Sequence, residues 1–290
     1  MSDPRHNVEL ADLARDTLRI TDGGGYDVNG ARVDIAAAVR AAVAGTRVFS
    51  TRELDDLLAS PAPTGDRRAK IQVTGETTQE ATHRLIASEG ERDVVLLNFA
   101  SATRPGGGFL SGARAQEEDL ARSSALYPCL EGQPAYYREH RDRKSHLYTD
   151  AMIHSPGVPF FRVRGNALCD RPYDASVITA AAPNAKRALL GAPVDLRSNE
   201  PARAGEVELV FRRRTGKLLA LAEHMAHPTL VLGAWGCGVF GNDPGMAADS
   251  FGTWLESSRF RASFERVVFA VYDPAFDKPS FTAFSKRLAP

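Results

Sequence analysis

The sequence predicts a three-layer α/β fold built on a largely parallel or mixed sheet. Strand patterns alternate with helix patterns along residues 69–272, which is the order that an α/β sandwich requires. Two of the strand patterns, residues 93–100 and 229–234, are near-continuous apolar runs, typical of strands covered on both faces. Each leads through a glycine-rich loop into a helix pattern, so we expect the two loops at the same edge of the sheet.

Composition limits the class of protein. At 290 residues the chain forms one large domain, or one domain and a smaller one. Lys and Arg total 36, as do Asp and Glu, so no bulk charge attracts nucleic acid or membrane, and a polyanionic partner must be gripped locally. The three cysteines form no CxxC pair, which favours reduced thiols in a cytoplasmic protein over disulfides or a zinc site. Neither a signal peptide nor the roughly 20-residue apolar run of a membrane span is expected.

The first 65 residues are predicted to be a helical extension packed onto a second region, residues 66–290. The boundary is the Pro/Gly loop at residues 61–65. Thr51-Arg52-Glu53 resembles a capping box and predicts the start of a helix. The elements expected here are helices at residues 7–20, 36–44 and 51–60, a glycine break at 21–30 and a short strand at 32–35.

The second region carries the alternating pattern, and residues 187–206 are expected to be a loop. Pro244 is well placed for the first turn of a helix. The strands expected are residues 69–73, 93–100, 151–154, 158–163, 176–181, 229–234 and 266–272. The helices expected are residues 77–88, 116–130, 134–141, 207–225 and 244–256.

The two glycine-rich loops predict an anion site. Gly106-Gly107-Gly108 carry no Cβ atoms, so a bulky ligand can lie against the backbone itself. The second loop, residues 235–242, follows the other buried strand, and two such loops suit a diphosphate. Neither loop matches the P-loop or the dinucleotide fingerprint, which disfavours nucleotide triphosphatases and dehydrogenases. A tight turn without a ligand is the alternative for either loop alone.

Glu117 and Glu118 open the helix that follows the first loop. Neighbouring residues on a helix point about 100° apart, so they are not expected to act as a facing pair. The helix N-terminus lowers the pKa of a carboxyl group, whereas a bound diphosphate would raise it again. On this hypothesis an acid here becomes competent only with substrate in place. The alternative is that both acids simply complement the helix dipole.

The first loop and these acids together resemble a known signature. Gly106-Gly107-Gly108, seven intervening residues and Gln116-Glu117-Glu118 are similar to the GGG…QEE signature of poly(ADP-ribose) glycohydrolases of the short bacterial type. The resemblance implies a macrodomain fold that hydrolyses ribose–ribose O-glycosidic bonds, reversing ADP-ribosylation. It also implies an oxocarbenium-like ribose that is stabilised by the neighbouring diphosphate and attacked by water, without a second carboxylate as nucleophile.

The resemblance also implies roles for individual residues. Glu118 would be the general acid, Glu117 would hold ribose hydroxyls of the leaving unit, and Asn98 would bind ribose. Val239 and Phe240 would pack on the ribose and clamp the diphosphate. The remaining implied contacts are Gly106, Gly107, Gly108 and Gln116 in the first cradle and Gly236, Cys237, Gly238 and Gly241 in the second. Apart from the resemblance, Tyr272 and Phe276 follow the last expected strand and are candidates for stacking on adenine, with ordinary core or edge packing as the alternative.

The expected ligands are poly(ADP-ribose), ADP-ribose and ADP-ribosylated proteins, with no cofactor and no metal. We expect a monomer that binds neither membrane nor nucleic acid directly. Two alternatives stay open: a module that binds ADP-ribose without cleaving it, and a phosphatase or deacetylase acting on ADP-ribose derivatives. His224, His227 and Arg212 to Arg214 are expected at the surface, and Cys237 is expected to be a small buried thiol rather than a nucleophile.

Overall fold

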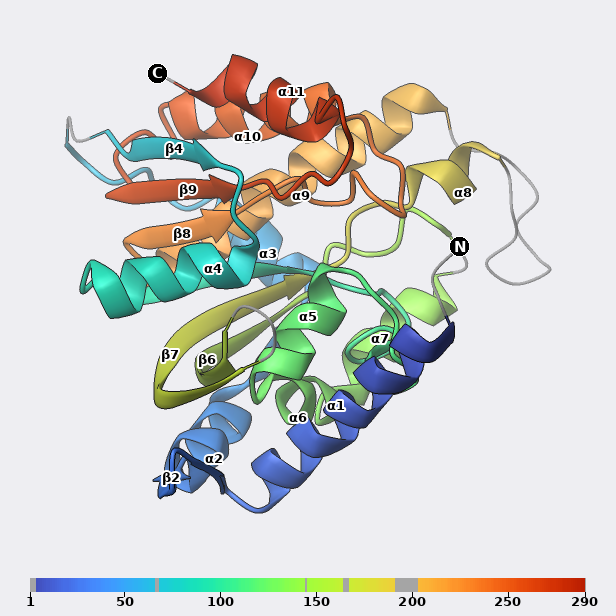
Figure 1. Ribbon diagram of the computed structural model, residues 1–290. Helices are drawn as coiled ribbons and strands as arrows, with labels where there is room; N and C mark the ends of the chain where they lie inside the picture. Colours follow the sequence, from blue (N-terminus) through green and yellow to red (C-terminus); the bar gives the residue numbers. More distant parts are fainter. Residues whose placement is uncertain (1–3, 66–67, 144, 164–166, 191–202, 290) are drawn as a thin grey trace.

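A mixed sheet forms the middle layer of the computed structural model, with helices on both sides (Figure 1). The structure describes residues 4–65, 68–143, 145–163, 167–190 and 203–289. Within these residues, seven strands lie in the order β3-β6-β7-β5-β8-β9-β4, and β6 alone runs against its two neighbours. The strands are β3 (Arg47–Phe49), β4 (Lys70–Thr74), β5 (Val94–Phe99), β6 (Met152–Arg162), β7 (Leu168–Ala180), β8 (Thr229–Leu232) and β9 (Arg266–Ala270). The predicted three-layer fold is confirmed.

Two hydrophobic cores lie on the two faces of this sheet. Alternate residues of β5 divide between them: Val95 and Leu97 face one core, Val94 and Leu96 the other. The first core is covered by α3 (Thr51–Leu58), α9 (Ala204–His224), α10 (Pro244–Glu256) and α11 (Pro279–Leu288). The second is covered by α1 (Pro4–Asp22), α2 (Ala36–Gly45), α4 (Thr78–His83), α5 (Gln116–Ser123), α6 (Leu126–Glu131) and α7 (Pro134–Asp142). The short α8 (Ala185–Leu189) follows β7.

The N-terminal segment both covers and extends the sheet. The predicted first helix is present as α1, and its Thr17 hydroxyl donates a hydrogen bond of 2.8 Å to the carbonyl of Arg122. The predicted glycine break contains a strand that was not expected, β1 (Gly25–Val28), which pairs with β2 (Ala31–Asp34). A second unexpected strand, β3, pairs with β6 at the edge of the central sheet.

Several boundaries differ from prediction for local reasons. The single helix expected over residues 116–130 is two helices, because Ser124 is extended and bridges to Phe160 of β6. The strands expected at 151–154 and 158–163 are one strand, β6, with an irregularity between Ser155 and Val158. The capping residue of α3 is Ser50 rather than Thr51, since Ser50 accepts a hydrogen bond from the N–H of Glu53.

The C-terminal part adds further differences. The predicted helix at 207–225 begins three residues earlier, at Ala204, and α11 was not predicted. Part of the loop expected at 187–206 belongs to α8 and α9, and residues 191–202 lie outside the described residues. The last residues of the helix expected at 77–88 form a π-helix, Arg84–Ser88.

Arg214 was predicted at the surface but is completely buried on α9. Its Nε donates a hydrogen bond to Asp150 (2.9 Å). The same carboxylate also accepts hydrogen bonds from Lys217 Nζ (2.7 Å) and Arg213 Nε (2.7 Å). The remaining Arg214 nitrogens donate to the carbonyls of Ala181 and Leu147, so the guanidinium holds the loop after β7. Burial alone would raise the pKa of Asp150, but the hydrogen bond from Arg213 and the charges of Arg214 and Lys217 outweigh burial and lower it.

His227 was also predicted at the surface and is buried. Its Nε2 lies 2.9 Å from Nε2 of His154, and its Nδ1 lies 3.0 Å from the carbonyl oxygen of Asp93. Burial lowers the pKa of both histidines, that of His154 to about 4, so the pair is neutral near pH 7. It closes the end of the sheet at which β8 begins.

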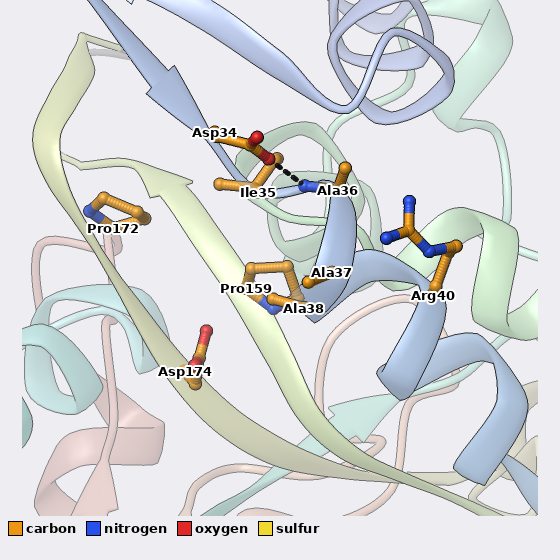
Figure 2. A pocket seen from close by; sticks show the side chains of 9 residues that line it. All are labelled: Asp34, Ile35, Ala36, Ala37, Ala38, Arg40, Pro159, Pro172 and Asp174. Atoms are coloured by element: carbon orange, nitrogen blue, oxygen red, sulfur yellow. Dashed lines mark hydrogen bonds between the residues drawn. The ribbon is translucent and has the colours of Figure 1, made fainter.

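A cavity of about 400 Å³ lies beside the β1–β2 hairpin and the start of α2 (Figure 2). Asp34 accepts a hydrogen bond from the N–H of Ala36 on its wall, and Asp174 and Arg40 lie around it. Pro159 of β6, beside Ala38 in the view, and Pro172 of β7 also line it. The cavity is far along β7 from the glycine loops, which leave the carboxyl ends of the strands.

We predict that Asp150→Asn destabilises the fold strongly, because it leaves the buried Arg214 and Lys217 without their shared carboxylate. The expected loss is about 3–5 kcal/mol in the free energy of unfolding, measured by chemical denaturation. Asp55→Asn is the matched control: Asp55 also contacts Lys217 (2.7 Å) but is 56% exposed, so its loss should stay below about 1 kcal/mol. Equal losses in the two variants would contradict this account of the cluster.

Candidate active site

Gln116 fixes the start of α5 to the end of β5. Its side-chain Nε2 donates to the carbonyl of Leu97 (2.7 Å), and its Oε1 accepts from the N–H of Phe99 (2.8 Å). The amide therefore takes the place that a neighbouring strand would occupy beyond the end of β8. Nε2 also lies 3.1 Å from the hydroxyl of Thr78 on α4. The first turn of α5 is thus held at a fixed position relative to the sheet.

The first glycine loop brings bare backbone against both carboxylates. Gly106 and Gly107 adopt left-handed backbone angles, φ 62° and 59°, which glycine alone adopts without cost. A Cβ atom on Gly107 would collide with Oε1 of Glu118 and lie 3.0 Å from Oε2 of Glu117. The two acids leave the helix in different directions and bind different groups, yet their carboxylates converge on one glycine. As expected, the two side chains accept hydrogen bonds from different groups, Ser101 N–H and Gly108 N–H. Their carboxylates nevertheless approach the same point above Gly107, which was not expected.

Glu117 is held deep beneath the turn that precedes the glycines. It is 2% exposed, and its Oε2 accepts from the N–H of Ser101 (2.7 Å). Burial raises the pKa of Glu117 to about 8; hydrogen bonds from Ser101 and Asn98 oppose the rise, and the charge of Glu118 adds to it. The pKa lowering expected from the helix N-terminus does not hold for Glu117, because desolvation dominates.

Glu118 is 8% exposed and binds the backbone of the loop. Its Oε1 accepts a hydrogen bond of 2.8 Å from the N–H of Gly108. Of the two acids it is therefore the one with more access to a ligand lying on the glycines.

Asn98 is fully buried at the carboxyl end of β5. Its Nδ2 lies 3.2 Å from Oε1 of Glu117 and 3.2 Å from the hydroxyl of Thr179. Its Oδ1 has no hydrogen-bond partner among the described residues. Exchanging the two ends of the amide would let Oδ1 accept the proton of a neutral Glu117, so Asn98 suits either protonation state of that acid.

The helix α1 supports the loop from behind. A Cβ atom on Gly112, which is left-handed at φ 75°, would collide with the carbonyl oxygen of Asn7. The fully buried Arg122 donates from Nη1 to the carbonyl of Ala113 (2.8 Å) and pairs with Asp119. Phe109, Ala121 and Tyr127 form a small core with Ala14 and Leu18 of α1. The N-terminal helix is therefore part of the wall of the site.

The second glycine loop leaves β8, the strand next to β5, and so reaches the same edge of the sheet. Gly236 and Gly241 are left-handed, at φ 73° and 67°. Asn242 closes the turn, since its Nδ2 donates to the carbonyls of Gly236 (2.9 Å) and Pro183 (2.8 Å). Sequence and structure therefore agree on two neighbouring glycine loops.

The side chains of this loop differ in exposure. Val239 is 79% exposed and Gly238 has open space beside it, so both are accessible to a ligand. Phe240 is half-buried, with its ring 6.2 Å from that of Tyr148. Cys237 is half-buried, whereas a buried thiol was expected. Desolvation raises the pKa of its thiol to about 12 and Asp243 adds to the rise, which favours the protonated thiol near pH 7 and disfavours a nucleophile.

Phe276 and Tyr272 follow the last strand, β9. Phe276 is fully exposed and Tyr272 is 64% exposed. Core packing, one of the alternatives considered for them from the sequence, is therefore wrong, and stacking of either ring on adenine stays a prediction.

Sequence reasoning missed several residues that shape the site. Ser101 follows the buried strand directly, and that position was a usable signal. Arg122 and Tyr127 carried no signal, because an arginine and a tyrosine on a predicted helix are more often exposed or ordinary core residues. Thr78 and Thr179 are equally ordinary in sequence.

Comparison with known families then identifies the chain. The family model described as "Microbial-type PARG, catalytic domain" matches residues 14–163. A structure of the poly(ADP-ribose) glycohydrolase from Thermomonospora curvata is similar at 44% identity and a TM-score of 0.88, covering 96% of this chain and 99% of its own. The chain belongs to the microbial-type poly(ADP-ribose) glycohydrolase family.

Two further glycohydrolase structures in this family contain ligands. That of Thermomonospora curvata bound to the inhibitor ADP-HPD is 44% identical, with a TM-score of 0.86 over 96% of this chain and 99% of the other. That of Deinococcus radiodurans in complex with ADP-ribose is 39% identical, with a TM-score of 0.77 over 90% of this chain and 98% of the other. A search of curated proteins finds no match.

None of the described helices is long and apolar enough to cross a membrane. Over the same residues, no group of three or more His, Cys, Asp or Glu side chains could hold a metal ion.

We predict that Gly112→Ala weakens the packing of the loop on α1. The added methyl group must displace the carbonyl of Asn7, which should lower the free energy of unfolding by about 1–3 kcal/mol beyond the backbone cost. Gly30→Ala is the matched control: Gly30 is also left-handed, at φ 77°, but has nothing within 4 Å of its Cβ position. Chemical denaturation of both variants measures the difference, and a difference of zero would contradict the support of the loop by α1.

We also predict a pH-dependent stability gap between the wild type and Glu117→Gln. Below pH 4.5 the carboxyl group is protonated in both the folded and unfolded chain; from there to about pH 8 the unfolded chain ionises and the folded chain does not. The wild type should therefore lose stability across this window relative to the glutamine variant, as followed by thermal unfolding. Glu139→Gln, which removes an exposed carboxyl group, controls for net charge. A gap that stays constant with pH would rule out a neutral Glu117.

Proposed function

We propose that the chain hydrolyses the ribose–ribose O-glycosidic bonds of poly(ADP-ribose) and releases ADP-ribose. One observation carries the proposal: two carboxylates converge on the bare backbone of Gly107 at the carboxyl end of β5. A family of glycohydrolases, with relatives solved in complex with ADP-ribose and ADP-HPD, supports this choice of substrate. A module that only binds ADP-ribose would not need two buried acids beside the glycine loop.

The proposed reaction begins with Glu118 as general acid. Its proton passes to the oxygen of the leaving ribose as the bond to the anomeric carbon breaks. The resulting oxocarbenium ion is stabilised by the negative charge of the substrate diphosphate, and water attacks it. A proton of that water returns to Glu118, which restores the acid. The hydrogen bond from Gly108 N–H holds the carboxylate in place throughout.

Glu118 is proposed as the acid rather than Glu117 because of access. Both oxygens of Glu117 are engaged by Asn98 and Ser101, and the side chain is only 2% exposed. Its raised pKa suits a neutral group that binds the ribose hydroxyls of the leaving unit by hydrogen bonds. Asn98 would then act on ribose through Glu117 as well as by direct contact.

The two loops would share the nucleotide. We assign the diphosphate to the backbone of Gly106, Gly107 and Gly108 on one side and to the loop from Gly236 to Gly241 on the other. Val239 and Phe240 would pack on the ribose, and Phe276 would stack on adenine, which its complete exposure permits. Gln116 would serve by holding α5, and Cys237 as an uncharged part of the loop.

The proposal extends to the substrates, oligomeric state, location and domain organisation of the chain. The substrates would include ADP-ribosylated proteins, and the chain would act as a cytoplasmic monomer without binding nucleic acid directly. Residues 66–290 would form the catalytic region and residues 1–65 an extension packed on it. The contact of α1 with the first loop means that this extension would also contribute to activity.

Glu118→Gln should abolish the release of ADP-ribose while sparing ligand binding. The amide can still accept the hydrogen bond from Gly108 N–H but has no acidic proton, so turnover should fall by about 10²–10⁴-fold. The test measures free ADP-ribose from poly(ADP-ribose) and, separately, ADP-ribose affinity by calorimetry.

Glu117→Gln provides the comparison of roles. It should raise KM for the polymer more than it lowers kcat, since Glu117 is assigned to binding the leaving unit. If Glu118→Gln kept its turnover and Glu117→Gln lost it, the assignment of the acid would be wrong. If the wild type released no ADP-ribose while binding it tightly, the chain would be a binding module.

A further inference from the structure

Exposed arginines without acidic partners lie beside the first glycine loop. Arg104, Arg138 and Arg141 are exposed, and none of them forms an ion pair with a carboxylate of the described residues. Many arginines elsewhere in the chain are paired, for example Arg84 with Glu76, Arg266 with Glu89 and Arg287 with Glu256. Unpaired arginines also occur elsewhere in the chain, and what distinguishes these three is that they lie on the first glycine loop and on the helix bonded to it.

Two elements bring these arginines together. Arg104 belongs to the turn that covers Glu117, since its carbonyl accepts from Gly107 N–H and its own N–H points to Ser101. Arg141, near the end of α7, donates from Nη1 to the carbonyl of Thr103 (2.8 Å), one residue before Arg104. Arg138 lies three residues earlier on α7, hence on the same side of that helix as Arg141.

One acid of α7 adjoins this group. Glu139 is turned about 100° away from Arg138, whereas Asp142 lies one turn after Arg138 on the same side of the helix, although no ion pair joins the two in the described residues. On the helix wheel, Arg141 and Arg138 lie on the flank next to the buried Tyr137, and Glu139 lies on the flank away from it. On the side of α7 that adjoins the loop, two arginines therefore outnumber the one acid, Asp142.

Figure 1 shows α7 on the side of the molecule toward which the arrowheads of β4 and β9 point. The carboxyl ends of the parallel strands, and with them both glycine loops, lie on this side. Arg104 is thus in the turn that holds Glu117, and Arg141 is bonded to that same turn.

We propose that Arg104, Arg138 and Arg141 form a subsite for the diphosphate of the polymer unit on the leaving side of the scissile bond. The inference rests on the proposed function and adds to it. The scissile oxygen belongs to the adenosine ribose of that unit, so its diphosphate must lie just beyond Glu117. A guanidinium matches phosphate oxygens with paired N–H donors, and Arg141 uses one nitrogen on Thr103 while the others remain available.

The test uses the double variant Arg104→Gln/Arg141→Gln and two substrates. One is poly(ADP-ribose); the other is ADP-ribose joined at the same anomeric carbon to a small aryl alcohol, which has no second diphosphate. For the polymer, KM should rise roughly five- to tenfold with kcat nearly unchanged, and the dependence of log kcat/KM on log salt should lose about one unit of slope. For the aryl substrate, kcat/KM should stay within about twofold of the wild type, because the cradle is intact.

Arg40→Gln/Arg171→Gln is the matched control. Both residues are exposed, neither forms an ion pair with a described carboxylate, and both lie at the β1–β2 end of the molecule. Its KM and salt slope on the polymer should equal those of the wild type.

Each outcome decides one question. Equal losses on both substrates, or equal losses in test and control variants, would overturn the subsite, as would an unchanged KM in the test variant. If the wild type released ADP-ribose from neither substrate, the proposed function itself would fail.

Discussion

The site depends on the contact between two carboxylates and a backbone without side chains. Glu117 and Glu118 both reach Gly107, and no residue with a Cβ atom fits there. The N–H groups of Ser101 and Gly108 hold one oxygen of each acid, and Gln116 holds the helix that carries them. Gln116 ties the helix to β5, and the N–H groups of Ser101 and Gly108 belong to the loop that follows this strand, so the geometry depends on the sheet and the first glycine loop together.

Burial gives this arrangement its chemical character. Desolvation opposes ionisation of Glu117, so the acid is neutral where an exposed glutamate would be charged. The opposite outcome is seen at Asp150, which is equally buried but surrounded by Arg213, Arg214 and Lys217, so that ionisation is favoured. The two clusters show that a buried acid in this fold is neutral where desolvation acts without adjoining cations and charged where cations surround it.

The parts of the structure that repeat a pattern were predictable from sequence. The buried strands β5 and β8, the glycine loops after them, and the helices α1 and α10 follow from apolar periodicity and turn residues. The position of Glu117 and Glu118 in the first turn of α5 was also predicted from the sequence. Two short strands were missed: β1 begins within the run of glycines that was predicted to be a break, and the three residues of β3 carry too little pattern.

The remaining misses depend on long-range contacts. The break between α5 and α6 exists because Ser124 meets Phe160, which lies on a strand remote in sequence. Arg214 is buried because Asp150, 64 residues away, neutralises it. His227 pairs with His154 across 73 residues. In each case a local rule, helix continuity or a charged surface, was overridden by a partner that periodicity cannot locate.

The contact between Asn7 and Gly112 has a practical consequence for handling the protein. The first turns of α1 lie directly behind the loop that carries the glycines, so a purification tag fused ahead of Pro4 would be attached close to the catalytic machinery. The helix α11 at the other end of the chain packs on α10 and β4, on the opposite face of the sheet. An affinity handle placed after α11 would leave the loop undisturbed.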